Sequence, residues 1–240
     1  VLLGLAATLN PLSAHPTYAA LKGKSLENRV AALRDPEIRA CLLAEQPTSD
    51  TRLKKVIGHF SRIWELGDCP NYEPHPHDSI AAIARREGRS PLEVAYDAML
   101  LQEGNALLYV PFDNFDEHNL DAVREMMLHK DTIMGLSDGG AHVGTICDAS
   151  FPTTLLTHWA RDRKRGARIP LPLLVKSQTL DTANAVGLND RGILRVGMRA
   201  DLNVIDFPTL QVHAPRVVHD LPAGGARLQQ RPDDVQPAHD

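Results

Sequence analysis

The sequence has few cysteines, and they are scattered. Cys41, Cys69 and Cys147 are the three in 240 residues, and no two of them form a Cys-x-x-Cys pair. An odd, scattered set argues against a disulfide framework and offers no paired thiols for a structural metal site. We interpret all three as small buried side chains and expect a protein of the reducing cytoplasm.

Aromatic residues and blocks of positive charge are also scarce. Aromatic side chains make up 5% of the chain, and its formal net charge is −4 at pH 7. Nucleic-acid-binding surfaces need clustered Lys and Arg, often with aromatic rings on which bases stack. These shortages predict that nucleic acid is not a partner.

Long apolar runs are absent as well. A membrane-spanning helix needs about 20 apolar residues. The opening run, VLLGLAATL, is shorter, and no basic segment precedes it as in a signal peptide. We interpret residues 1–6 as a buried strand whose upstream context has been cut away, and we predict no membrane partner.

The pattern that is present alternates strands with helices. Hydrophobic residues make up 43% of the chain, as in ordinary globular proteins. Strands are expected over 1–6, 56–60, 106–111 and 132–136, and helices over 25–43 (divided at Asp35-Pro36), 79–88, 90–104, 120–128, 153–163 and 173–186. Such alternation indicates parallel βα units and an α/β fold.

Ser137-Asp138-Gly139-Gly140 is the first motif that could take part in catalysis. An acidic residue just after a buried parallel strand would lie at the catalytic face of an α/β barrel. There, a carboxylate can take a proton from water and return it to a leaving amine. An Asp-Gly turn whose carboxylate satisfies loop amides is the alternative, because such turns are common.

A second motif lies near the C-terminus. A helix rich in small residues ends at Gly187, the turn Gly192-Ile193-Leu194 leads to Gly197, and Ala200-Asp201-Leu202 enters a short apolar strand that ends at Asp206. This ordered combination resembles the C-terminal signature of the amidohydrolase superfamily. The resemblance implies the C-terminal part of a (β/α)8 TIM-type barrel over 1–190 and part of a small β-sandwich over 191–230. The polar tail, 231–240, is expected to be disordered.

A narrower resemblance covers residues 135–163, GLSDGGAHVGTICDASFPTTLLTHWARDR, together with LNPLSAHP at 9–16 and Tyr72-Glu73-Pro74. These segments are similar to the N-acyl-D-amino-acid deacylases, or D-aminoacylases. The resemblance implies a zinc-dependent hydrolase that removes the N-acyl group from a small-molecule N-acyl-D-amino acid. It gives Asp138 the roles of metal ligand and catalytic acid and base.

The other metal ligands of that superfamily have no counterpart in this sequence. Its His-x-His pair follows the first barrel strand, whereas His75-Pro76-His77 lies in a loop ahead of a capped helix, which is typical of a solvated pair. His59 follows a short apolar run but is typical of a core or surface histidine. We therefore expect a fragment or truncated product that is inactive by itself.

His142 lies four residues past Asp138 and is a candidate for binding the substrate carboxylate or tuning Asp138. A loop histidine bonded to the backbone fits equally well. Asp148 is better explained as a loop or cap residue, and His15 as a loop residue. Two rival functions stay open: a cyclic amide hydrolase of the dihydroorotase or hydantoinase kind, and a non-catalytic fragment. A homo-oligomer is compatible with all of them.

Overall fold

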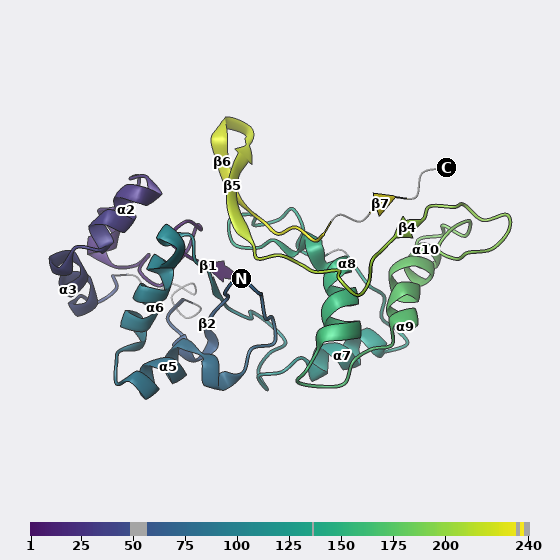
Figure 1. Ribbon diagram of the computed structural model, residues 1–240, viewed down its shortest axis with the longest axis horizontal. Coiled ribbons are helices and arrows are strands. Elements are labelled where there is room, and N and C mark those ends of the chain that lie inside the picture. The colour runs from purple at the N-terminus through teal and green to yellow at the C-terminus, as the bar shows by residue number, and fades with distance from the viewer. Residues whose placement is uncertain (49–56, 136, 234–235, 238–240) are drawn as a thin grey trace. The chain divides into compact units, whose positions relative to one another are not determined.

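The computed structural model describes residues 1–48, 57–135, 137–233 and 236–237. The chain divides into two compact units, whose helices and strands are shown as a ribbon in Figure 1. Unit 1 consists of residues 1–118, 142–146 and 216–229, and unit 2 consists of residues 119–141, 147–215 and 230–240. No helix in the described residues is long and apolar enough to cross a membrane.

Unit 1 is built on a small three-stranded sheet with helices around it. The strands are β1 (Leu2–Leu3), β2 (Trp64–Glu65) and β3 (Leu108–Tyr109), in the order β1-β3-β2. Its helices are α1 (Pro16–Ala19), α2 (Leu26–Leu33), α3 (Pro36–Ala44), α5 (Ile80–Glu87) and α6 (Pro91–Leu100), with short turns η1 (Phe60–Arg62), η2 (Pro76–Asp78) and η3 (Leu101–Gly104). A hairpin of β5 (Arg216–Leu221), η7 (Pro222–Gly224) and β6 (Gly225–Gln229) completes it.

The strands of this sheet do not form the expected parallel barrel. β3 runs antiparallel to both neighbours, pairing Leu2 and Trp64 with Tyr109. The connection from β2 to β3 contains two helices, α5 and α6, that pack together. A strand followed by a helical hairpin returns in the opposite direction, whereas one crossover helix gives a parallel strand. The described residues form a mixed helix and strand structure without a closed barrel, so the barrel arrangement predicted from the sequence is not seen here.

The core of unit 1 confirms that the opening run is buried. Leu3, Leu5 and Leu12 are almost fully shielded and pack with Ile63, Ile80 and Met99 in one cluster. Burial of each such side chain contributes about 1.5–3 kcal/mol. Gly4 permits the close approach of β1 to the segment ahead of β3, because a Cβ there would lie 2.9 Å from the Ala106 carbonyl oxygen.

The helix starts and stops predicted from capping residues are confirmed in unit 1. Asp35 accepts hydrogen bonds from the amides of Glu37 and Ile38, and it separates α2 from α3 as expected. Ser79 caps α5, and Gly88 ends that helix in the left-handed region at φ 67°. Side-chain caps satisfy amides that the first turn of a helix leaves unpaired.

The capping box predicted at the start of α6 forms only in half. Ser90 Oγ accepts a hydrogen bond from the Glu93 amide at 3.2 Å. The Glu93 carboxylate instead contacts Arg39 of α3 at 3.2 Å and Arg89 at 3.6 Å. Both arginines also pair with Asp97, so four charged side chains link α3 to α6. A charged guanidinium is a stronger partner for a carboxylate than a backbone amide.

Two predicted strands are wrong where the structure describes them. In 56–60, Ile57 is helical and Phe60 begins η1, while Val56 lies outside the described residues. Residues 132–135 have no regular structure, and Leu136 lies outside the described residues. An apolar run of this length fits a strand, a helix end or an irregular buried segment equally well.

Unit 2 is helical at its centre. Its helices are α7 (Asp121–Leu128), α8 (Phe151–Thr154), α9 (Leu171–Lys176) and α10 (Thr182–Ala185), with a short turn η4 (Asp148–Ser150) ahead of α8. The four α-helices lie in or overlap the helical regions predicted for 120–128, 153–163 and 173–186, whereas η4 lies ahead of the second region. The π-helical segments η5 (Leu155–Asp162) and η6 (Ser177–Asp181) continue α8 and α9, a rare form that the sequence pattern did not indicate.

A buried arginine ties the helices of unit 2 together. The side chain of Arg163 is fully buried over the Trp159 ring, 4.8 Å from its centroid. It donates hydrogen bonds to Asp121 Oδ1 at 2.7 Å and to the Ala167 carbonyl oxygen at 2.8 Å. Gly166 leaves room for it, because a Cβ at that position would lie 2.6 Å from the guanidinium carbon.

We expect Arg163→Met to lower the free energy of unfolding by about 1–3 kcal/mol, because the Ala167 carbonyl and Asp121 lose a charged donor. Urea unfolding followed by circular dichroism measures the change. Lys164→Met removes the same charge one residue later from an exposed side chain, and it should stay within about 0.5 kcal/mol of the unchanged protein. Equal losses in the two variants would contradict the role of the buried guanidinium.

The short strands predicted beyond Gly192 are confirmed. β4 (Asn203–Val204) pairs with β7 (Gln236–Pro237) in unit 2, and β5 pairs with β6 in unit 1. Residues 236–237 of the tail are therefore in a strand, whereas 234–235 and 238–240 lie outside the described residues. The domain boundary predicted at 190/191 stays a prediction.

Candidate functional site

Asp138 lies in a glycine turn of unit 2. The turn is closed by a hydrogen bond from the Ala141 amide to the Asp138 carbonyl oxygen at 3.2 Å, and Gly140 has φ 99°. Gly139 packs closely on η4, because a Cβ there would lie 3.2 Å from Ala149. Ser137 Oγ donates to the Asp148 carboxylate at 3.2 Å and so fixes the other side of the turn.

The Asp138 side chain is exposed, and its carboxylate makes no hydrogen bond or ion pair with the residues that the structure describes. The alternative explanation, a turn carboxylate that satisfies loop amides, therefore finds no support in this geometry. The predicted strand ahead of it is absent over 132–135, so Asp138 does not follow a barrel strand there. A free carboxylate on a glycine turn can accept and return a proton.

His142 belongs to unit 1, whereas Asp138 belongs to unit 2. His142 is exposed, and its backbone is left-handed at φ 48°. Its carbonyl oxygen accepts hydrogen bonds from the amides of Thr145 at 2.8 Å and Ile146 at 3.0 Å. The backbone of His142 thus organises residues 142–146, and a role of its ring beside Asp138 stays a prediction.

The described residues do not fit a zinc ion. No group of three His, Cys, Asp or Glu side chains among them lies close enough together to hold a metal. A catalytic zinc site usually has three protein ligands and one open position. Asp138 could supply one ligand, and no cluster with two further ligands surrounds it in the part of unit 2 that the structure describes.

The His75 and His77 pair is not arranged as a metal clamp. The two rings are exposed and stack with centroids 4.7 Å apart. His75 Nδ1 accepts a hydrogen bond from the His77 amide at 3.2 Å. In a neutral ring with this bond, Nε2 carries the proton and has no lone pair for a metal. The pair therefore serves the turn ahead of α5, as the sequence indicated.

The other titratable candidates occupy structural positions. His59 is exposed at the start of η1, and His15 is buried at the start of α1. Asp148 begins η4 and holds Ser137, in agreement with its interpretation as a loop residue.

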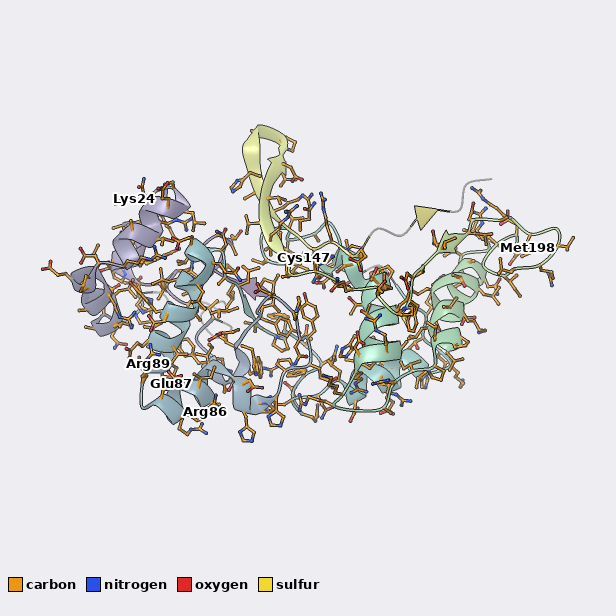
Figure 2. The ribbon with its side chains drawn as sticks, in the orientation of Figure 1. Lys24, Arg86, Glu87, Arg89, Cys147 and Met198 are labelled. Carbon is orange, nitrogen blue, oxygen red and sulfur yellow. The ribbon has the colours of Figure 1, made fainter. Side chains whose placement is uncertain are left out.

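The interpretation of the cysteines as buried is wrong for two of the three. Cys41 is on the exposed side of α3, and Cys69 lies in the exposed turn after β2. Cys147, labelled in Figure 2, is partly buried. Burial, assisted by the negative charge of Asp148, raises the pKa of the Cys147 thiol to about 12.

We expect Cys147 to react with iodoacetamide much more slowly than Cys41 and Cys69 at pH 8, because the thiolate is the nucleophile. The high pKa keeps Cys147 protonated there, and its labelling should rise as the pH approaches 12. Mass spectrometry of the labelled peptides over time measures the three rates. A fast reaction of Cys147 at pH 8 would contradict its raised pKa.

Unit 2 contains a pocket that the sequence pattern did not indicate. An open pocket of about 290 Å³ lies beside η5 and η6 and is lined mainly by apolar side chains, among them Leu156, Val175, Ile193, Leu202 and Ile205. Its polar groups include Arg199 and Asp201, which pair at 2.7 Å. The signal was present in the apolar residues between 193 and 205, which the sequence pattern assigned to short strands.

Comparison with known proteins gives the class of the chain. The sequence model described as amidohydrolase family matches residues 2–227, nearly the whole chain. The match identifies a hydrolase domain whose family acts on amide or similar bonds. The chain therefore belongs to the amidohydrolase family. Comparisons with curated proteins and with solved structures find no significant match.

Proposed function

We propose that this chain carries part of the active site of a hydrolase that removes the N-acyl group from N-acyl-D-amino acids, with Asp138 as the group that transfers protons. The observation behind the proposal is the free Asp138 carboxylate on a glycine turn, in a chain that belongs to a family of amide hydrolases. The choice of substrate is supported by the likeness of residues 135–163 to the D-aminoacylases.

The proposed chemistry needs a carboxylate with a lone pair directed to solvent. Asp138 would take a proton from the water that attacks the amide carbon. It would then return that proton to the departing nitrogen, so that the C–N bond breaks and a carboxylate and a free amino acid form. Gly139 and Gly140, which follow Asp138, let the backbone turn without a side chain in the way of substrate.

Zinc belongs to the same proposal. The described residues contain no cluster of three side chains that could hold it, and Asp138 is the one ligand that the family resemblance assigns. No step is therefore assigned to the metal. Its binding is testable apart from turnover, since metal content can be measured in the purified protein.

The test is hydrolysis by the natural polypeptide that carries these 240 residues, assayed with added zinc. N-acetyl-D-methionine, N-acetyl-L-methionine, dihydroorotate and hydantoin separate the alternatives. We expect release of the free amino acid from the D-enantiomer at least about tenfold faster than from the L-enantiomer. Cleavage of the cyclic amides alone would replace the proposal with a cyclic amide hydrolase, and inactivity on all four would reject the substrate class.

A further inference from the structure

Three of the five methionines of the chain lie together in unit 2. Met126 and Met127 belong to α7, which Figure 1 labels, and Met134 lies in the irregular segment that follows it. They line an apolar pocket of about 230 Å³ together with Val123, Thr132 and Ile133. The other two methionines are Met99 in α6 and Met198, which Figure 2 labels in the loop between α10 and β4.

The pocket leads from solvent toward the core of unit 2. The Met126 side chain is 43% exposed, whereas Met127 and Met134 are partly buried and pack against the cluster that contains Trp159. A small reagent therefore reaches the Met126 side chain without unfolding of the chain. Met99, in the core of unit 1, is 0% exposed and provides a shielded methionine for comparison.

The lining of this pocket offers no free hydrogen-bond donor from a side chain. Thr132 is the one lining residue with a polar side chain, and its Oγ1 lies 2.6 Å from the Met126 carbonyl oxygen and 2.8 Å from that of His129. Because a hydroxyl has a single proton, this donor is already used. Ligand sites usually contain a few free polar groups that orient the ligand. The thioethers are therefore the reactive groups of this pocket.

Hydrogen peroxide oxidises a thioether in one step. The methionine sulfur attacks one oxygen of the peroxide, so that an S–O bond forms, the O–O bond breaks and water leaves. Sulfur loses two electrons, and the peroxide gains them. The product, methionine sulfoxide, is polar where the thioether was apolar. Burial of its oxygen without a donor costs free energy, so an oxidised side chain is expected to leave the pocket for water.

We propose that Met126, Met127 and Met134 form a site of reversible oxidation by hydrogen peroxide. Oxidation begins at Met126 and then reaches the two inner thioethers, which separates residues 132–134 from α7. Clustered methionines are adaptable packing groups, and their sulfoxides disrupt the contacts that the thioethers make. This site does not include Asp138, and it does not depend on the proposed hydrolysis.

The test uses the full chain, with the exposed thiols of Cys41 and Cys69 first blocked by iodoacetamide. Hydrogen peroxide is added, and mass spectrometry of peptides follows each methionine over time. We expect Met126 to be oxidised first and at least about tenfold faster than Met99, because exposure governs the reaction. The midpoint of thermal unfolding should fall by about 2–4 °C or more. Hydrogen exchange should become faster in residues 121–134.

Reduction with methionine sulfoxide reductases A and B and dithiothreitol should restore both the unfolding midpoint and the slow exchange, because the two enzymes act on the two epimers of the sulfoxide. Restoration would show that the sulfoxides, and no other peroxide product, cause the change. A lowered midpoint that persists after complete reduction would contradict the proposal.

Two variants locate the effect. The triple variant Met126→Leu, Met127→Leu and Met134→Leu keeps side chains of similar volume that peroxide does not oxidise, so its unfolding midpoint should no longer respond. Met198→Leu removes a partly exposed methionine of unit 2 outside the pocket, and this matched control should respond as the unchanged chain does. Oxidation of Met126 no faster than Met99, sulfoxides without a lower midpoint, or equal responses of both variants would overturn the proposal.

Discussion

Asp138→Asn is expected to lower the turnover of an N-acyl-D-amino acid by about 10²–10⁴-fold in the active protein, because Asn matches the shape of Asp but cannot take the proton from water. The loss should fall on kcat more than on KM, since the carboxylate acts in the chemical step and not in binding alone. Circular dichroism and thermal unfolding should be unchanged, because this carboxylate has no partner among the described residues to lose.

Asp148→Asn is the matched control for this experiment. Asp148, at the start of η4, accepts a hydrogen bond from Ser137, so its replacement perturbs the loop but not the proposed proton transfer. We expect a loss of less than about tenfold. Wild-type turnover in Asp138→Asn would contradict the catalytic role of Asp138. Equal losses of turnover in both variants would indicate that Asp138 only shapes the turn.

The second large effect is expected in metal binding. The 240-residue chain, purified with excess zinc and dialysed, should retain well under one zinc per chain and show no hydrolysis of N-acetyl-D-amino acids. A catalytic zinc site usually has three protein ligands. Asp138 supplies one carboxylate, and His75 Nδ1 already accepts a hydrogen bond from the His77 amide. No group of three ligating side chains forms among the described residues.

Metal analysis by mass spectrometry and an assay of amino acid release measure the two quantities on the same sample. A metal that binds the native state tightly raises the thermal unfolding temperature, and its removal lowers that temperature. Because we expect no such metal in this chain, excess EDTA should leave the unfolding temperature unchanged. Stoichiometric zinc with clear turnover would show that the ligands are brought together in this chain after all.

Local elements of this fold could be predicted from the sequence because local interactions determine them. Asp35, Ser79 and Ser90 accept hydrogen bonds from the amides that their positions in the chain indicated, and Gly88 ends α5 as expected. These bonds join residues two or three positions apart, so a sequence motif contains both partners. The helices α5, α6 and α7 could be predicted for the same reason, because the periodicity of their apolar residues is also a local pattern.

Strand direction and the surroundings of Asp138 could not be predicted in this way. The pairing of Leu2 with Tyr109 joins residues that are far apart in the sequence, and it depends on how many helices lie between the strands. The run 132–135 is apolar but too short to specify a strand by itself. The family resemblance pointed to Asp138. The structure adds that its carboxylate has no partner among the described residues. This depends on where residues distant in the sequence lie, which no local motif contains.

The ion pairs between α3 and α6 have a consequence for the rates of folding and unfolding. Arg39 and Asp97 are 58 positions apart, whereas the capping bonds of the two helices span two or three. The caps can form in each helix before the chain has closed, but the ion pairs can form only once both helices have docked. Contacts made after the rate-limiting step slow unfolding and leave the folding rate almost unchanged. We therefore expect replacement of Arg39 to speed unfolding more than it slows folding.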